Sequence, residues 1–232
     1  MTTRASGSVP RRDRRTDARS GPRPLVATIV VIFEVFEGRL RVLLVRRSGP
    51  PERGHWALPG GRWDGAETLE GAAQRKLVDE TGATDLYLEQ LFSASGLDAA
   101  HPAAVVVCYV ALVDGGTVRL REEQTWRPAW HEVDALPPLA FRNEEVIAQA
   151  VERIRAKLEY TNVAYGLLPE DFTFAELQSA YEAIAGGALD RRNFRKRMLG
   201  TGLIEPTGEL RRAGAHRPAR LYRFTTREPV FL

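Results

Sequence analysis

The segment from residue 58 to residue 83 constrains the fold more than any other part of the chain. It opens with Leu-Pro-Gly-Gly, and adjacent glycines indicate a turn in which the backbone approaches other groups closely. A helix is predicted over residues 68–81, with Gly82 at the position where helices commonly stop. The apolar positions of this helix, four residues apart, are Leu69, Ala73 and Leu77. This segment therefore predicts a glycine turn leading into one amphipathic helix.

β-Branched runs around this segment predict strands, so that residues 25–158 form one mixed α/β domain. Residues 25–33 and 40–45, separated by Glu37-Gly38, predict a hairpin. Further strands are expected at residues 86–92, 103–113, 118–120 and 129–133. A second helix is expected after Asn143 as its N-cap and to run to Leu158, with one broad apolar stripe.

Residues 159–232 show a different pattern, which predicts a second, smaller domain. Thr173 and Glu176 form a capping box that starts a helix, and Gly186-Gly187 ends it. Asp190 can cap the next helix, and a hairpin is expected between residues 203–205 and 220–224. Two helices across a short turn, followed by a hairpin, are typical of a winged helix-turn-helix domain.

Charge is distributed unevenly along the chain. Residues 1–24 carry a net +5, residues 25–190 carry −10, and residues 191–223 carry +8, so that the whole chain has only +3. Residues 1–24 have almost no large apolar side chains, and we expect a flexible basic arm there. The basic C-terminal unit favours a polyanionic partner, with an ordinary solvated surface as the alternative.

The basic side chains of the C-terminal unit cluster on the second helix and on the hairpin that follows it. Because helix and hairpin share one sign of charge, they predict a surface that neutralises the phosphates of duplex DNA. Apart from Phe194, which is expected to face the core, the helix segment 191–197 has no aromatic residue for stacking on single-stranded bases. The predicted DNA-binding residues are Arg191, Arg192, Arg195, Lys196, Arg197, Arg217 and Arg220.

Residues 61–83 resemble the Nudix box, because glycine, glutamate, arginine and acidic positions have the spacing of that motif throughout. The matching positions are Gly61, Glu67, Arg75, Lys76, Asp79, Glu80 and Gly82. In active members of the family, three carboxylates spaced i, i+3 and i+4 on one helix face hold Mg²⁺ or Mn²⁺ for diphosphate hydrolysis.

The box departs from the family pattern at its first metal-ligand position, where Lys76 stands in place of a carboxylate. Lysine supplies no oxygen ligand, and Lys76 is placed to pair with Asp79 and Glu80. We therefore expect no catalytic residues and no metal site, with Asp79 and Glu80 vestigial and Mg²⁺ not required. Hydrolysis with one metal, held by Glu67, Asp79, Glu80 and backbone oxygens, remains the alternative.

The C-terminal stretch resembles the winged-helix domain of the Nudix-related transcriptional regulators of NAD metabolism, the NrtR family. The resemblance is carried by residues 167–169, 172–173, 176–178, 181–182, 189–190, 193–194 and 217–222. It implies a Nudix-type α/β/α sandwich with a mixed sheet, followed by a small winged helix-turn-helix domain. It also implies a homodimer that represses NAD biosynthesis or salvage genes and senses ADP-ribose or a related NAD-derived nucleotide.

For the ligand, arginine and glycine residues near the box are expected to meet a diphosphate. The predicted ligand-binding residues are Arg46, Arg47, Gly60, Gly61 and Arg62. The stretch 141–143 replaces an Asp-His pair common in related regulators and alters the expected rim of the pocket. The helix from Asn143 to Leu158, joined to the winged helix through residues 159–166, is the expected transmitter between ligand and DNA.

Two other classes of function remain open at this stage. One is an active ADP-ribose pyrophosphatase with an accessory nucleic-acid-binding domain, and the other is a Nudix enzyme directed to RNA. The sequence has no apolar run of about 20 residues and no signal peptide, so a cytoplasmic protein without membrane contact is expected. The single cysteine, Cys108, lies in an apolar run and is expected to fill the core.

Overall fold

The computed structural model describes residues 24–82, 87–120, 127–212 and 218–231. The arm expected over residues 1–24 therefore lies outside the described residues, apart from Pro24. In chain order, the elements are β1 (Val26–Phe36), β2 (Arg39–Arg46), β3 (Trp56–Ala57), β4 (Gly60–Arg62), α1 (Leu69–Thr81), β5 (Tyr87–Ser95), β6 (Val105–Leu112), β7 (Arg127–Glu132), the 3₁₀ turn η1 (Val133–Ala135), α2 (Asn143–Tyr160), the 3₁₀ turn η2 (Val163–Leu167), β8 (Phe172–Thr173), α3 (Phe174–Ala185), α4 (Arg191–Gly200), β9 (Ile204–Arg211) and β10 (Ala219–Phe224).

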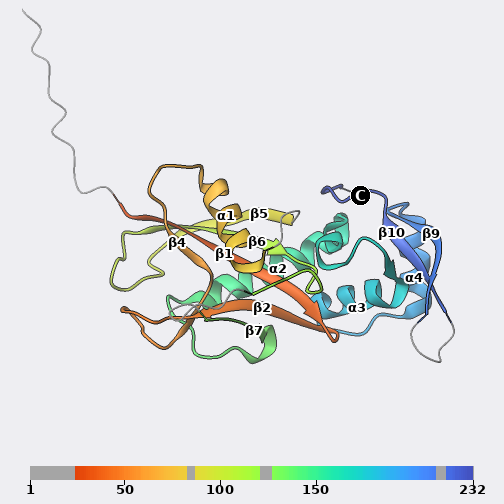
Figure 1. Ribbon diagram of the computed structural model, residues 1–232, viewed down its shortest axis with the longest axis horizontal. Coiled ribbons are helices and arrows are strands. Elements are labelled where there is room, and N and C mark those ends of the chain that lie inside the picture. The colour runs from red at the N-terminus through yellow and green to blue at the C-terminus, as the bar shows by residue number, and fades with distance from the viewer. Residues whose placement is uncertain (1–23, 83–86, 121–126, 213–217, 232) are drawn as a thin grey trace, which may run out of the picture.

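A mixed sheet of seven strands forms the N-terminal part of the molecule (Figure 1). Its main order is β3-β2-β1-β6-β5, with β4 also pairing with β1 and β7 with β2. β1 and β2 form the predicted hairpin, and Glu37 and Gly38 at its turn both have positive φ, 50° and 75°. Two such residues make the turn whose twist matches that of antiparallel strands. β1 runs parallel to β6, which confirms the mixed sheet.

The sheet lies between two helices because successive side chains of β1 point to opposite faces. Val30 and Ile32 belong to a buried cluster with Leu77 of α1. Val31 and Phe33 belong to a second cluster, which includes the apolar side chains of α2. The alternation in one strand therefore supplies both cores, and the α/β/α sandwich is confirmed.

Two local predictions in this domain were wrong. Residues 118–120 form no strand; Val118 is buried in the α1 cluster, and Arg119 N–H donates to the carbonyl of Thr81 at 2.9 Å. Asn143 is the first helical residue of α2 and not its N-cap, which is Arg142 at φ 52°. The Asn143 side chain instead accepts a hydrogen bond from the backbone N–H of Leu58.

The winged helix-turn-helix arrangement is confirmed in residues 172–224. The Thr173–Glu176 capping box starts α3, and the Asp190 carboxylate accepts the N–H of Asn193 at the start of α4. The order of the three-stranded sheet is β8-β10-β9. Phe172 and Leu177 share one buried cluster with Val31 of the large sheet, so the two domains pack against each other directly.

Cys108 is fully buried on β6, and burial raises the pKa of its thiol to about 12. A thiol with such a pKa stays protonated at neutral pH and is a poor nucleophile, so its expected place in the core is confirmed. No helix in the described ranges has the length and apolar character needed to cross a bilayer.

Candidate functional site

Two cations hold the three carboxylates of the box. Arg75 donates two hydrogen bonds to Oε1 of Glu67, from Nε at 3.0 Å and from Nη2 at 2.6 Å. The Arg75 guanidinium also lies 3.6 Å from Asp79. Lys76 Nζ lies 2.7 Å from Oε1 of Glu80, whose side chain is only 2% exposed. Asp79, expected as a second partner of Lys76, therefore pairs with Arg75.

These residues do not fit a divalent cation. Mg²⁺ prefers near-octahedral oxygen coordination, and a lysine occupies the first of the three ligand positions. The buried carboxylate of Glu80 is already neutralised by that ammonium group. The box consequently keeps its loop and helix, while each of its three carboxylates is paired with a cation of the box.

A pocket of about 200 Å³ opens beside the box, where β4 meets the N-terminal ends of the internal strands β1 and β6. It brings together four of the five predicted ligand-binding residues. Its lining comprises Leu25, Ala27, Ile29, Arg47, Ala57, Leu58, Gly60, Gly61, Arg62, Leu97, Asp98, Ala104, Val106, Phe141 and Asn143. The pocket therefore combines apolar walls with two arginines and one acidic side chain.

The pocket wall requires a glycine at position 60. A Cβ atom there would lie 2.4 Å from the carbonyl oxygen of Thr28, because β4 pairs closely with β1. At Gly61 a Cβ atom would meet nothing within 4 Å, so its neighbourhood is open. The two adjacent glycines therefore have different roles. Gly60 permits the close pairing of β4 with β1, and Gly61 leaves open space beside the backbone.

The two neighbouring arginines take different positions. The Arg47 guanidinium lies over the Phe141 ring, 4.4 Å from its centroid, and donates to the Pro51 carbonyl at 2.9 Å. Arg46 is exposed, does not line this pocket, and donates to the Gly54 carbonyl at 3.4 Å. Arg46 lines an adjoining pocket together with Arg47 and Gly60, so it lies beside the first pocket and not in its lining.

The opposite rim of the pocket was not predicted from the sequence. Leu97 and Asp98 come from the segment after β5, and Phe141 and Asn143 come from the start of α2. Asn143 and Phe141 had been recognised only as a departure from the family pattern. Nothing in the local pattern of Leu97-Asp98 marks them, because they reach the pocket through the pairing of β5 with β6.

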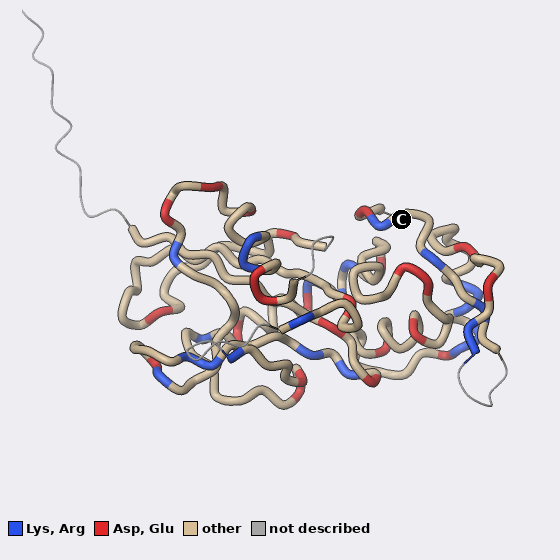
Figure 2. The backbone as a smooth tube through the Cα atoms, in the orientation of Figure 1, with Lys and Arg blue, Asp and Glu red and all other residues tan. Residues whose placement is uncertain are grey.

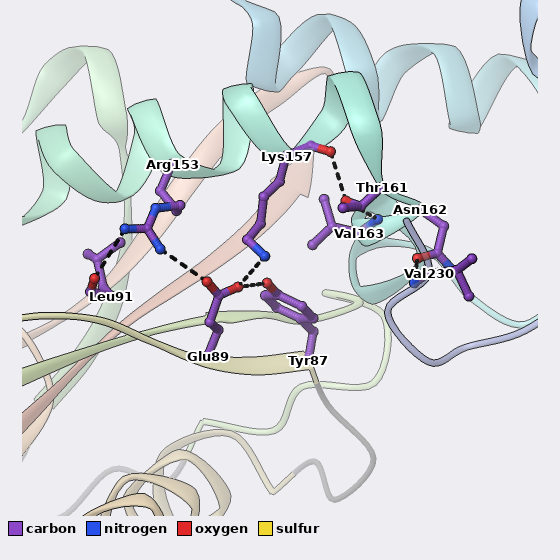
Figure 3. Close-up of polar contacts among 9 residues, drawn as sticks. All are labelled: Tyr87, Glu89, Leu91, Arg153, Lys157, Thr161, Asn162, Val163 and Val230. Atoms are coloured by element: carbon purple, nitrogen blue, oxygen red, sulfur yellow. Dashed lines mark hydrogen bonds and ion pairs between the residues drawn. The ribbon is translucent and has the colours of Figure 1, made fainter. Parts of the chain in front are cut away.

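The far end of α2 is anchored by a polar network (Figure 3). Glu89 of β5 is contacted by Arg153 at 3.1 Å, by Lys157 at 2.7 Å and by the hydroxyl of Tyr87. Burial acts to raise the pKa of Glu89. The hydrogen bonds from Lys157 and Tyr87, with the positive charges of Lys157 and Arg153, outweigh burial and hold that pKa below its ordinary value.

Just beyond α2, Asn162 fixes the segment that follows the wing. Asn162 is fully buried; its Oδ1 accepts the N–H of Val230 at 2.8 Å, and its amide nitrogen donates to the Glu228 carbonyl at 2.9 Å. Arg227 donates to the carbonyls of Tyr165 and Leu168 at 2.9 and 3.0 Å. We call residues 226–231 the return segment, because they lead from the wing back to the end of α2.

Basic residues gather on α4 and on the wing strands (Figure 2), at the opposite end of the molecule from β4, whose residues line the pocket (Figure 1). Five of the predicted DNA-binding residues are on α4, all exposed as whole residues, and Arg220 is exposed on β10. Arg217 lies outside the described residues. Phe194 and Met198 are 4% and 2% exposed, which confirms that the apolar edge of α4 faces the core.

Two family profiles match the two parts of the chain. The NUDIX domain profile matches residues 24–150, and the profile described as NrtR DNA-binding winged helix domain matches residues 164–224. The chain is 36% identical over 215 residues to the ADPR responsive transcriptional repressor NtrR of Acinetobacter baylyi, covering 90% of this chain and 86% of the relative.

Solved structures extend this similarity to three dimensions. Shewanella oneidensis NrtR complexed with a 27mer DNA matches with a TM-score of 0.76 and 34% identity, over 86% of this chain and 93% of that one. The NUDIX domain of the same protein complexed with ADP ribose matches with a TM-score of 0.52 and 33% identity, over 60% of this chain and 94% of that one. With both domains matched and the order of its elements accounted for, the chain belongs to the NrtR family, in which a Nudix domain is joined to a DNA-binding winged helix.

Proposed function

We propose that this protein is a transcriptional repressor that binds duplex DNA through its winged helix and releases it when ADP-ribose, or a related NAD-derived diphosphate, occupies the Nudix pocket. The observation that carries the proposal is the pairing of Lys76 with the buried Glu80. It favours a box that has kept its shape for binding and given up its role in hydrolysis. The names of the Acinetobacter baylyi relative and of the Shewanella oneidensis complexes support the same assignment.

In the pocket, Arg47 and Arg62 are the groups suited to a diphosphate, since guanidinium groups donate paired hydrogen bonds to phosphate oxygens. The open space at Gly61 allows a ligand to approach the backbone closely. The apolar walls from β1 and β6 suit the uncharged face of a base or sugar. We therefore place the ligand against β4, with Arg46 in the adjoining pocket.

The box itself has no hydrolytic role in this proposal. Arg75 and Lys76 pair with Glu67, Asp79 and Glu80, so the ligand needs neither Mg²⁺ nor another cofactor to bind. An ordinary enzyme would turn over about one substrate per second or faster. Hydrolysis of ADP-ribose at such a rate by the purified protein would favour the pyrophosphatase alternative.

Coupling between pocket and DNA is assigned to α2. Asn143, at its first turn, lines the pocket, while Arg153 and Lys157 near its last turn bind Glu89 of the sheet. Immediately after the helix, Asn162 holds the return segment of the winged-helix domain. A shift of α2 on ligand binding would thus reach the winged helix through a continuous set of contacts.

The proposal includes a homodimer on a two-fold-symmetric operator, with half-sites about one helical turn apart or a multiple of that distance. The target genes proposed are those of NAD biosynthesis or salvage in the same organism. The test is a fluorescence anisotropy titration of the full chain against the duplex upstream of that operon, with and without ADP-ribose. Specific binding that weakens at saturating ADP-ribose is expected. Unchanged DNA affinity with bound ligand, or no ligand binding at millimolar concentration, would remove the sensor role.

A further inference from the structure

Arg195 differs from the other basic residues of α4 because its guanidinium group contacts side chains of both α3 and β10 within the same domain. Its Nη2 donates to the hydroxyl of Tyr222 on β10 at 2.6 Å. The same group lies over the Phe174 ring of α3, 4.6 Å from the centroid, and 5.6 Å from the centroid of Tyr222. One side chain thereby joins α3, α4 and the wing strand β10.

The partners of Arg195 are themselves fixed. Tyr222 is 3% exposed and Phe174 is 9% exposed, and their rings meet edge to face at 5.6 Å between centroids. An arginine that reached away to DNA would leave both ring contacts and the hydroxyl hydrogen bond. The cation–π contacts and the charged hydrogen bond therefore favour the docked position of the Arg195 side chain.

The neighbouring cations offer a direct contrast. Arg191, Arg192 and Lys196 are exposed and form no ion pair or hydrogen bond through their side chains with any residue that the structure describes. These side chains are available for phosphates or base edges. Sequence spacing had grouped Arg195 with Arg191 and Lys196 on one surface, but the contacts separate it from them.

We propose that Arg195 is a positioning residue for DNA binding, which holds α4 at a fixed angle to the wing and does not itself contact DNA. This inference rests on the proposed DNA-binding function. The planar guanidinium suits the role, since it can stack on one ring while donating to the hydroxyl of another. Recognition helix and wing then approach DNA as one preformed surface, so less ordering is needed on binding.

The test compares the salt dependence of operator affinity in the full chain for four variants: Arg195→Ala, Tyr222→Phe, the double variant, and Lys196→Ala as the matched control. Each phosphate contact contributes about 0.9 to the slope of log K against log salt concentration. We expect Arg195→Ala and Tyr222→Phe each to weaken binding about fivefold to tenfold with the slope of the wild type. The double variant should be no weaker than Arg195→Ala. Lys196→Ala should lower the slope by about 0.9 if it contacts a phosphate.

Two results would overturn the inference. One is a loss of about 0.9 in slope for Arg195→Ala, which would make it a phosphate contact. The other is wild-type operator affinity for Tyr222→Phe. This variant removes one oxygen and leaves the ring, so the inference can still be tested if Arg195→Ala is poorly folded. Failure of the wild-type chain to bind any duplex would instead count against the proposed function, so the two failures are distinguishable.

Discussion

The side-chain oxygen of Asn143 accepts a hydrogen bond from the backbone N–H of Leu58 at 2.8 Å. Both residues line the pocket, yet they lie 85 positions apart in the sequence. The bond joins the first turn of α2 to the strand region that leads into the box. Asn143 is only 2% exposed, so no water can take its place as the acceptor for the Leu58 N–H.

Replacing Asn143 with alanine should therefore destabilise the protein. A buried donor left without a partner costs about 1–3 kcal/mol, and we expect the free energy of unfolding to fall by that amount. Urea unfolding followed by circular dichroism measures it. Glu144→Ala, an exposed change in the same turn, is the control and should stay within about 0.5 kcal/mol of the wild type. Equal effects of the two changes would show that the Leu58 bond contributes little.

Removal of divalent metal should leave ADP-ribose binding unchanged. Lys76 already neutralises Glu80, so the dissociation constant measured by calorimetry should agree within a factor of about two in Mg²⁺ and in EDTA. Lys76→Glu restores three carboxylates on one helix face and should make the affinity depend on Mg²⁺. Gln74→Glu adds a carboxylate at an exposed position two residues earlier and should not make the affinity depend on Mg²⁺. A wild-type protein that loses its ligand in EDTA would contradict this account.

The Glu89 network should affect coupling more than ligand binding. Glu89→Gln removes the charge that Arg153 and Lys157 bind, and it loosens the far end of α2 from the sheet. We expect ADP-ribose affinity to stay within about twofold, while the ratio of operator affinities without and with ligand falls by about threefold to tenfold, within the usual range of coupling energies.

Glu152→Gln is the matched control for that experiment. Glu152 lies on the same helix, is 72% exposed and pairs only locally with Arg155 among the described contacts. In Glu152→Gln, the ratio of operator affinities without and with ligand should equal that of the wild type. If Glu89→Gln behaves like this control, the signal does not pass through the contact between α2 and β5.

Stability should fall in mildly acidic solution because of His131. Burial lowers the pKa of His131 below its ordinary value of 6.5, and its Nε2 is buried without a hydrogen-bond partner among the described residues. Since the unfolded state then takes up the proton more readily, the contribution of His131 is complete above pH 6.5 and is lost as the pH falls through the folded-state pKa.

The corresponding measurement is urea unfolding between pH 7.5 and 5. His131→Phe keeps a ring beside Trp56, which the histidine meets edge to face at 4.5 Å, and should show a flatter dependence on pH. His55→Gln, at an exposed position, should follow the wild type. A wild-type curve no steeper than that of His131→Phe would rule out this histidine as the source.

Local signals explain which parts could be predicted from the sequence. The helix α1 matched closely because Thr68 and Gly82 cap it within its own segment, and α3 and α4 are capped by Thr173 and Asp190 in the same way. Such caps act over three or four residues, so a sequence pattern contains all the information they need.

Long-range contacts explain the rest. Asn143 was misassigned as a cap because its true partner, Leu58, comes from a distant strand. Arg195 was predicted as a DNA-binding residue from helical spacing, which cannot show its hydrogen bond to the hydroxyl of Tyr222, 27 residues away. Residues 118–120 have a strand-like composition, but among the described residues they find no neighbouring strand to pair with. Residue type and spacing set what a side chain can do, while tertiary neighbours select which of these options it takes.

The return segment gives the joint between the domains a mechanical property. The chain crosses that joint once after α2 and again at residues 226–231, and Asn162 ties the two crossings together. Because one buried amide holds both crossings, the winged helix is fastened to the Nudix domain at its end as well as at its beginning. The shared buried cluster adds a third attachment between the two domains. Loss of residues 226–231 would therefore remove one of these attachments while leaving the sequence of α3, α4 and the wing intact.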